Sequence, residues 1–278
     1  MAELEEMQIR FWGVRGSIPC PGPNTVRYGG NTSCVEVRCG DDLLIFDAGT
    51  GLRGLGIALA AEKRPIQAEI FCSHTHYDHI CGVAFFAPCF NPSSNLRFWA
   101  GHLPPGMTIR EVIGNSLSEP YLPNLLDVIA AQLEFEDFES GDGFSPRPGI
   151  AVRTAPLNHP GGATGYRLEW QGKSVAYITD TEHRPDELDA NVLSLIEGAD
   201  VMIYDATYTE AEYIVHAGWG HSTWQEAVRL AEQASVRKLV LFHHDPTHTD
   251  AILDAIAQEL ESAKANAVIA HEGMVISL

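Results

Sequence analysis

Apolar residues recur along this chain in short runs of roughly four to eight residues, the length typical of β-strands. In the run at 33–38 apolar and polar side chains alternate, as expected of a strand with one buried face. Each half of the chain contains several such runs. They lie at residues 8–12, 33–38, 43–46, 69–73, 150–155, 165–170, 175–179, 201–204, 239–242, 268–270 and 274–278.

Longer segments between these runs predict helices. The segment 52–63 ends at Arg64-Pro65, and Ile252, Ile256 and Leu260 form one apolar stripe on a helix over 250–264. Further helices are predicted at 186–197 and 223–234. Two mixed halves with strands inside and helices outside indicate an α/β protein, a four-layer α/β/β/α sandwich.

Residues 82–135 interrupt this pattern. Residues 82–125 are rich in Pro, Gly and Asn, which predicts loops with short helices near 108–115 and 124–132. We therefore expect one domain over residues 1–278, with an insertion or lid at about 82–135.

The first candidate for chemistry is the sequence His-Thr-His-Tyr-Asp-His at 74–79, directly after an apolar run. Imidazole and carboxylate ligands suit zinc, and also manganese or iron. We expect His74 and His76 to bind one ion, and Asp78 and His79 to bind another. The alternative is a chance surface cluster in a chain with twelve histidines.

Three further ligand-type residues come after strand-like runs. They are His159, Asp180 and His243. Each alone would more often be an ordinary loop residue, but together with the 74–79 motif they indicate a site for two metal ions. Cys81 and Cys89 follow the motif closely, and we expect them to pack rather than to bind metal.

With these residues the chain resembles the metallo-β-lactamase fold superfamily, and Leu43-Leu44-Ile45-Phe46-Asp47-Ala48-Gly49 extends the match. The resemblance implies that Asp180 bridges the two metals, that Asp47 supports the site, and that hydrolysis is the reaction. His243 is preferred over His244 because His-x-x-Pro fits the family better. The implied ligands of the first metal are His74, His76 and His159, and those of the second are Asp78, His79 and His243.

Two later motifs resemble the ribonuclease Z and cyclic-phosphodiesterase branch of this superfamily. They are Asp205-Ala206-Thr207 and His221-Ser222-Thr223. The resemblance implies that Asp205 supports His221, and we place both in the catalytic set with Asp78. Ribonuclease Z usually has Glu where this chain has Asp205, which argues against a strict role in tRNA processing.

The expected reaction is attack of a metal-bridging hydroxide on phosphorus. His221, oriented by Asp205, would stabilise the phosphorane-like oxygens or protonate the leaving alkoxide. The alternative for His221 is a contact at a helix N-terminus without any role in chemistry. We expect two divalent ions as cofactors, zinc before manganese or iron.

The charge of the chain bears on its substrate. There are 18 basic and 37 acidic residues, a net charge of −19, and no cluster of Lys and Arg. Such a chain repels polyanions at long range, so we do not expect extended nucleic-acid binding. We expect a small anionic phosphodiester, with cyclic nucleotides or other cyclic phosphates foremost, and Trp219 as a candidate to stack a base.

Location and assembly are less constrained by the sequence. No apolar run approaches the roughly 20 residues that span a bilayer, so no membrane partner is expected. The acidic segment 1–6 does not resemble an export signal, which favours a cytoplasmic protein with free thiols. The superfamily resemblance makes a homodimer conceivable.

Three other functions remain open. A thioesterase or lactonase would use the same metals without needing His221. Ribonuclease Z-like RNA processing would need a surface that grips RNA. A catalytically inactive nucleotide-binding sensor would bind through the same site, although the intact set of ligands argues against it.

Overall fold

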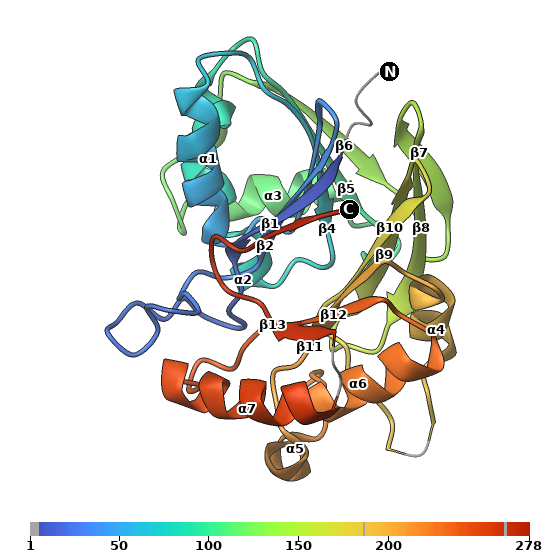
Figure 1. Cartoon of the computed structure of the whole chain (residues 1–278). Helices are drawn as coiled ribbons and strands as arrows, with labels where there is room; N and C mark the ends of the chain where they lie inside the picture. Colours follow the sequence, from blue (N-terminus) through green and yellow to red (C-terminus); the bar gives the residue numbers. More distant parts are fainter. Residues whose placement is uncertain (1–5, 186, 264–265) are drawn as a thin grey trace.

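Two seven-stranded β-sheets pack face to face, and helices cover the outer face of each sheet (Figure 1). The computed structural model describes residues 6–185, 187–263 and 266–278. The predicted helix ends at 186 and 264, and residues 1–5 of the acidic N-terminal segment, lie outside this part. The four-layer α/β/β/α sandwich predicted from the sequence is confirmed.

The first sheet contains the first six strands and the last one. Its order is β14-β1-β2-β3-β4-β5-β6, so the end of the chain pairs with its beginning. From β3 to β6 neighbouring strands are parallel. The strands are β1 (Met7–Gly13), β2 (Cys34–Cys39), β3 (Asp42–Phe46), β4 (Gln67–Cys72), β5 (Asn95–Ala100), β6 (Gln132–Asp137) and β14 (Val275–Ser277).

The second sheet follows the order β13-β12-β11-β10-β9-β8-β7. Strands β7 to β10 form antiparallel hairpins, and β10 to β13 are parallel. The strands are β7 (Gly143–Arg147), β8 (Ile150–Leu157), β9 (Ala163–Trp170), β10 (Lys173–Ile178), β11 (Val201–Asp205), β12 (Lys238–Phe242) and β13 (Ala267–Ile269).

Apolar side chains fill all three interfaces between the layers. Between the sheets, the rings of Phe46 and Tyr177 stack with centroids 5.0 Å apart, and both residues are fully buried. Helices α1 (Gly51–Ala61) and α3 (Ile109–Ser116) lie on the outer side of the first sheet. Helices α4 (Ala190–Ile196), α6 (Trp224–Gln233) and α7 (Asp250–Ala263) cover the second sheet. None of the described helices is long and apolar enough to cross a membrane.

The segment 82–135 differs from the loop-rich prediction. Residues 95–100 form β5, which lies between β4 and β6 in the first sheet, so this part of the segment belongs to the sheet. A helix at 109–116 agrees with the prediction, but residues 125–127 form only a 3-10 turn before β6. Whether any part of the segment acts as a lid stays a prediction.

Strand ends place the candidate residues at one edge of the sandwich. Asp47 follows β3, Asp180 comes two residues after β10, and His243 follows β12. Their φ angles are 59°, 54° and 61°, in the left-handed region that side chains other than glycine rarely adopt. Such conformations persist where the surroundings enforce them, and they cluster at functional sites.

Candidate metal centre

The 74–79 motif forms a tight loop after β4 that enters the short helix α2 (Tyr77–Ile80). His74, Asp78 and His79 are buried, while His76 is exposed. The four side chains divide between two groups. His74 and His76 face one group of ligand atoms, and Asp78 and His79 face the other.

The first group contains His74, His76 and His159, whose ligand atoms all lie within 4.8 Å of one another. Nε2 of His159 is 3.1 Å from Nδ1 of His76. Nδ1–H of His159 donates to the carbonyl oxygen of Gly220 at 2.8 Å. That bond sets the tautomer and leaves Nε2 with the lone pair that a metal needs.

The surroundings of His74 show whether a metal ion fits the first group. Its Nε2 is buried, and among the residues that the structure describes it has no hydrogen-bond partner. Its Nδ1 lies 3.1 Å from Oγ of Ser73, which leaves Nε2 directed into the group. Burying an unsatisfied polar atom is costly, and a metal ion bound to Nε2 removes that cost. The donor set therefore fits a metal ion.

The second group contains Asp78, His79 and His243. Nε2 of His79 lies 3.2 Å from Oδ2 of Asp78 and 3.3 Å from Nε2 of His243. The backbone N–H of Ser17 donates to Oδ2 of Asp78 at 2.8 Å and orients that carboxylate. Two imidazoles and a carboxylate converge here, and this set of donors suits a metal ion.

Asp180 lies between the two groups and presents one oxygen to each. Its Oδ1 is 3.7 Å from Nε2 of His74 and 3.8 Å from Nε2 of His159. Its Oδ2 is 3.3 Å from Nε2 of both His79 and His243. This placement lets one carboxylate contact both groups of ligand-type residues.

A layer of hydrogen bonds holds the second group in place. Oδ2 of Asp47 accepts from Nδ1–H of His79, from Oγ–H of Ser73 and from the hydroxyl of Tyr177, each at 2.8 Å. Such partners fix the tautomer and the ring orientation of a ligating histidine. Asp47 was expected in this role, whereas Tyr177 carried no signal in the sequence beyond its place in a strand.

The His221–Asp205 pair lies beside the second group. Nδ1–H of His221 donates to Oδ2 of Asp205 at 2.9 Å, and the ring stacks on His243 with centroids 4.9 Å apart. Thr207 donates to Oδ1 of Asp205 through both its backbone N–H and its hydroxyl. The structure thus joins the two later motifs at the centre, with Asp205 buried beneath His221.

His74 and His221 have pKa values shifted in opposite directions. Burial lowers the pKa of His74 well below its ordinary value, so that ring is neutral and able to bind a metal. Burial also opposes the charged form of His221, but the Asp205 carboxylate outweighs it and raises the pKa to about 9. His221 therefore carries a proton at neutral pH, as a general acid must.

The structure separates the rival histidines at 243 and 244. Nε2–H of His244 donates to the carbonyl oxygen of Ala270 at 2.8 Å, away from both groups. Burial lowers its pKa to about 3. Among the described residues, His243 belongs to a cluster of potential metal ligands and His244 does not. Neither Cys81 nor Cys89 belongs to such a cluster in the described part of the chain.

A two-sheet sandwich whose strand ends gather five imidazoles and two carboxylates around two centres defines a metal-binding protein of the metallo-β-lactamase fold. The chain belongs to the β-lactamase superfamily, because the sequence model of the family described as "Beta-lactamase superfamily domain" matches residues 43–244.

Individual relatives extend the likeness over nearly the whole chain. Ribonuclease Z from Methanosarcina mazei is 26% identical over 317 aligned positions, which cover 98% of each chain. The metallo-beta-lactamase fold protein YhfI from Bacillus subtilis has a TM-score of 0.74 at 19% identity, covering 99% of this chain and all of that one. A diphosphatase from the PhnP family has a TM-score of 0.69 at 19% identity, covering 98% of both chains. The two structures show likeness of fold.

Proposed function

We propose that this protein is a metal-dependent phosphodiesterase that cleaves small phosphodiesters, foremost cyclic nucleotides or other cyclic phosphates. The observation that carries the proposal is the buried His221–Asp205 pair, which stacks against the proposed metal ligand His243. Metal-dependent cleavage of thioesters or lactones needs no such pair, whereas expulsion of an alkoxide from phosphorus benefits from an acid at that position.

The proposed ligands follow the two groups. His74, His76 and His159 would hold the first ion, Asp78, His79 and His243 the second, and Asp180 both. Zinc suits this set of imidazoles and carboxylates, with manganese or iron as alternatives. When bound, the two ions would supply Lewis acidity toward the phosphoryl oxygens and an activated water nucleophile.

His221 would provide the proton. Its Nδ1–H is held by Asp205, so its Nε2–H remains for the substrate. The Asp205 carboxylate would keep the His221 imidazolium charged and oriented. Asp205 is itself held by three donors, the N–H and Oγ–H of Thr207 and the N–H of Thr181. In this arrangement the proton moves from Nε2 to the leaving oxygen.

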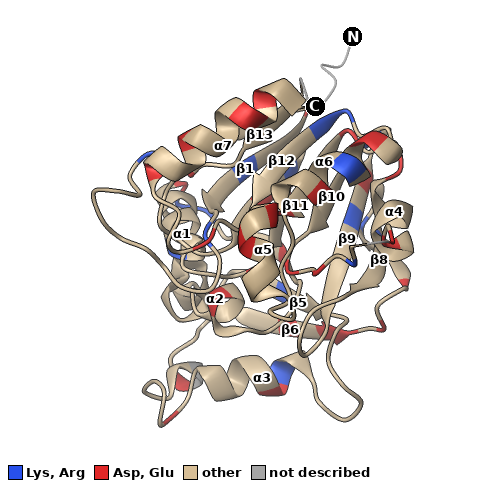
Figure 2. Ribbon diagram, turned by 90° about the horizontal axis from the view of Figure 1, so that it is seen from below, with Lys and Arg blue, Asp and Glu red and all other residues tan. Residues whose placement is uncertain are grey.

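A second candidate function is RNA processing. Relatives named ribonuclease Z weigh against the expectation that nucleic acids are unlikely partners. Small substrates remain favoured because acidic segments are spread over α7 and α5 (Glu210–His216), while the basic segments are few and scattered (Figure 2). Trp219, 63% exposed and two residues before His221, would suit a nucleobase.

The test of the class is hydrolysis of bis(p-nitrophenyl) phosphate and 3′,5′-cyclic nucleotides by protein of counted metal content, with thioesters, lactones and a precursor tRNA in parallel. We expect about two metal ions per chain and turnover of both diesters. Two ions with rapid thioester or lactone cleavage and intact diesters would overturn the proposal. Preferential cleavage of the tRNA would select the second candidate.

Two variants separate the proposed roles. His221→Ala should lower kcat on cyclic nucleotides about 100-fold or more and leave the metal content unchanged, because His221 acts as acid and not as ligand. Asp180→Asn should lose metal and activity together, since it weakens the bridge. Metal analysis and kinetics on both proteins check this, and a fully active His221→Ala protein would exclude the acid role.

A further inference from the structure

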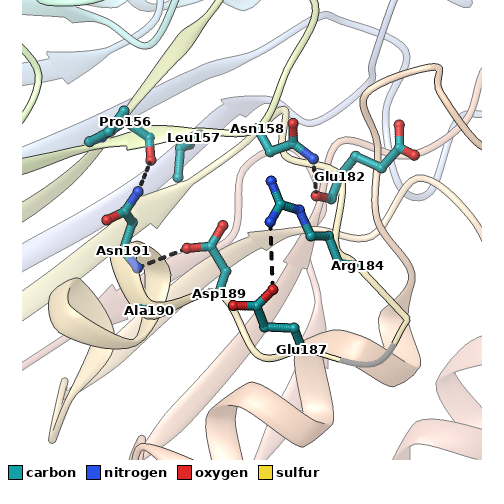
Figure 3. A pocket seen from close by; sticks show the side chains of 9 residues that line it. All are labelled: Pro156, Leu157, Asn158, Glu182, Arg184, Glu187, Asp189, Ala190 and Asn191. Atoms are coloured by element: carbon teal, nitrogen blue, oxygen red, sulfur yellow. Dashed lines mark hydrogen bonds and ion pairs between the residues drawn. The ribbon is translucent and has the colours of Figure 1, made fainter.

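Glu182 makes a pair of contacts that the proposed chemistry does not explain. It lies two residues after Asp180, and its carboxylate accepts the backbone N–H of Gly218 on Oε1 at 2.8 Å and that of Gly220 on Oε2 at 2.7 Å. Figure 3 shows this carboxylate extending away from Arg184 and Glu187, which pair with each other. Both oxygens of Glu182 are thus committed to one loop.

The loop that Glu182 holds is connected to both parts of the proposed machinery. Gly220 gives its N–H to Glu182, while its carbonyl oxygen accepts from Nδ1 of His159, and the next residue is His221. Gly220 has a φ of 88°, and a Cβ there would lie 2.4 Å from Nδ1 of His159. This position therefore requires glycine, because any side chain would be strained and would clash with His159.

The segment before this loop is held by polar contacts and ring stacking. Oε1 of Glu212 lies 2.9 Å from Nε2 of His248, and the ring of His216 stacks on that of Tyr208 with centroids 4.5 Å apart. Helix α5 has no buried residue, so burial of apolar surface does not hold it on the second sheet. The hydroxyl of Tyr213 adds a contact at the loop, because its single proton is shared between Oε1 of Glu182 at 3.1 Å and the carbonyl oxygen of His183 at 3.0 Å. One carboxylate thus receives donors from α5 and from both glycines. Few buried contacts make such a segment prone to local opening.

We propose that Glu182 is a positioning residue that clamps the Gly218–Gly220 loop and thereby holds His221 in line with the leaving group. This inference rests on the proposed role of His221 as acid. A carboxylate suits the task because hydrogen bonds from two N–H groups to a charged acceptor are strong and fix direction. Without the clamp, His221 keeps its bond to Asp205 but its backbone gains freedom.

The kinetic test compares two leaving groups. In Glu182→Gln the side-chain amide oxygen can accept only one of the two glycine N–H groups. The amide NH2 faces the other N–H, and two donors cannot bond, so the clamp is broken. We expect kcat on a 3′,5′-cyclic nucleotide to fall about tenfold, because its alkoxide leaving group needs the proton. On bis(p-nitrophenyl) phosphate, whose leaving group needs none, the fall should stay within about twofold. Glu187→Gln, which removes an exposed carboxylate on the same segment, is the matched control.

A double-mutant cycle shows whether Glu182 acts through His221. Adding Glu182→Gln to His221→Ala should cause no further loss on the cyclic nucleotide. The inference is overturned if Glu182→Gln behaves as Glu187→Gln, or if its full effect persists without His221. A His221→Ala protein as active as the unmodified one would instead defeat the proposed function.

Amide hydrogen exchange tests the clamp without any substrate. In the metal-loaded Glu182→Gln protein, exchange at residues 217–221 should rise at least tenfold, while exchange in α6 stays unchanged. In Glu187→Gln both should match the unmodified protein. Unchanged exchange at 217–221 in Glu182→Gln overturns the clamp whatever the substrate proves to be.

Discussion

At the scale of single residues, Asp47 illustrates how a buried carboxylate prepares a histidine for metal binding. It receives three donors on one oxygen and has a left-handed backbone, so its position is set from several sides. Asp47→Asn should weaken metal binding about 10–100-fold, because Nδ1 of His79 loses its anionic partner. Titration against a chelator measures the effect.

The control for Asp47 is Tyr177→Phe, which removes one of the three donors and leaves the carboxylate. Its effect on metal affinity should stay below about tenfold, since Ser73 and His79 still hold Asp47. Equal affinity in Asp47→Asn and the unmodified protein would show that Asp47 serves only the backbone turn.

Gly16 gives a second prediction, because there is no room for a side chain between it and His243. A Cβ at Gly16 would lie 2.3 Å from Cε1 of His243, a fully buried ring whose Nδ1 also contacts Oγ1 of Thr207 at 3.0 Å. Gly16→Ala should displace the ring and reduce affinity at the second metal site at least about tenfold. Metal stoichiometry per chain measures it.

Gly22→Ala is the matched control for Gly16→Ala. A Cβ at Gly22 meets no atom within 4 Å, so metal content and activity should stay unchanged. Full metal content in Gly16→Ala would mean that the His243 ring can shift without leaving its proposed ion.

The residues that sequence analysis found and missed differ in the kind of signal they carry. The seven proposed ligands were predicted because His and Asp at strand ends are conspicuous, and the structure brings them together. Glu182 and Tyr177 act through contacts with segments far away in sequence, at Gly220 and Asp47. Spacing along the chain cannot reveal such contacts, since they depend on how the two halves pack.

At the scale of elements, the N-caps of α5 and α6 should differ in their effect on stability. Thr223 caps α6 and is fully buried, whereas Thr209 caps α5, which has no buried residue. Thr223→Ala should lower the free energy of unfolding by about 1 kcal/mol. Thr209→Ala should leave it nearly unchanged, because we expect α5, which has no buried residue, to open locally before the molecule unfolds. Urea denaturation compares the two, and equal losses would contradict this view.

The difference in burial between α5 and α6 also explains why the sequence predicted one and not the other. Helices α6 and α7 have apolar faces that produce a clear period, whereas α5 presents no such face and was missed. Strand β5 alternates buried and partly buried residues, but the Pro- and Asn-rich residues around it obscured that pattern. Hydrophobic period therefore predicts elements with a clear apolar face. It fails where that face is absent, as in α5, or where turn-forming residues surround it, as around β5.

At the scale of the whole molecule, the net charge of −19 predicts how salt affects catalysis. The protein repels an anionic diester at long range, so screening should raise kcat/KM about twofold or more between 20 and 200 mM NaCl. Kinetics with a cyclic nucleotide at several NaCl concentrations measure it. A fall in kcat/KM with salt would indicate a basic binding surface, as nucleic-acid binding requires.

The pairing of the last strand with the first has a consequence for self-association. Strand β14 covers only Gln8–Arg10 of β1, and β1 alternates buried apolar residues, Met7, Ile9 and Phe11, with partly buried ones. Loss of the last few residues by proteolysis would leave β1 as a long edge with unpaired N–H and C=O groups. Such an edge is a template for strand addition by another chain. Loss of β14 would therefore replace a short edge strand by the longer β1 and favour aggregation.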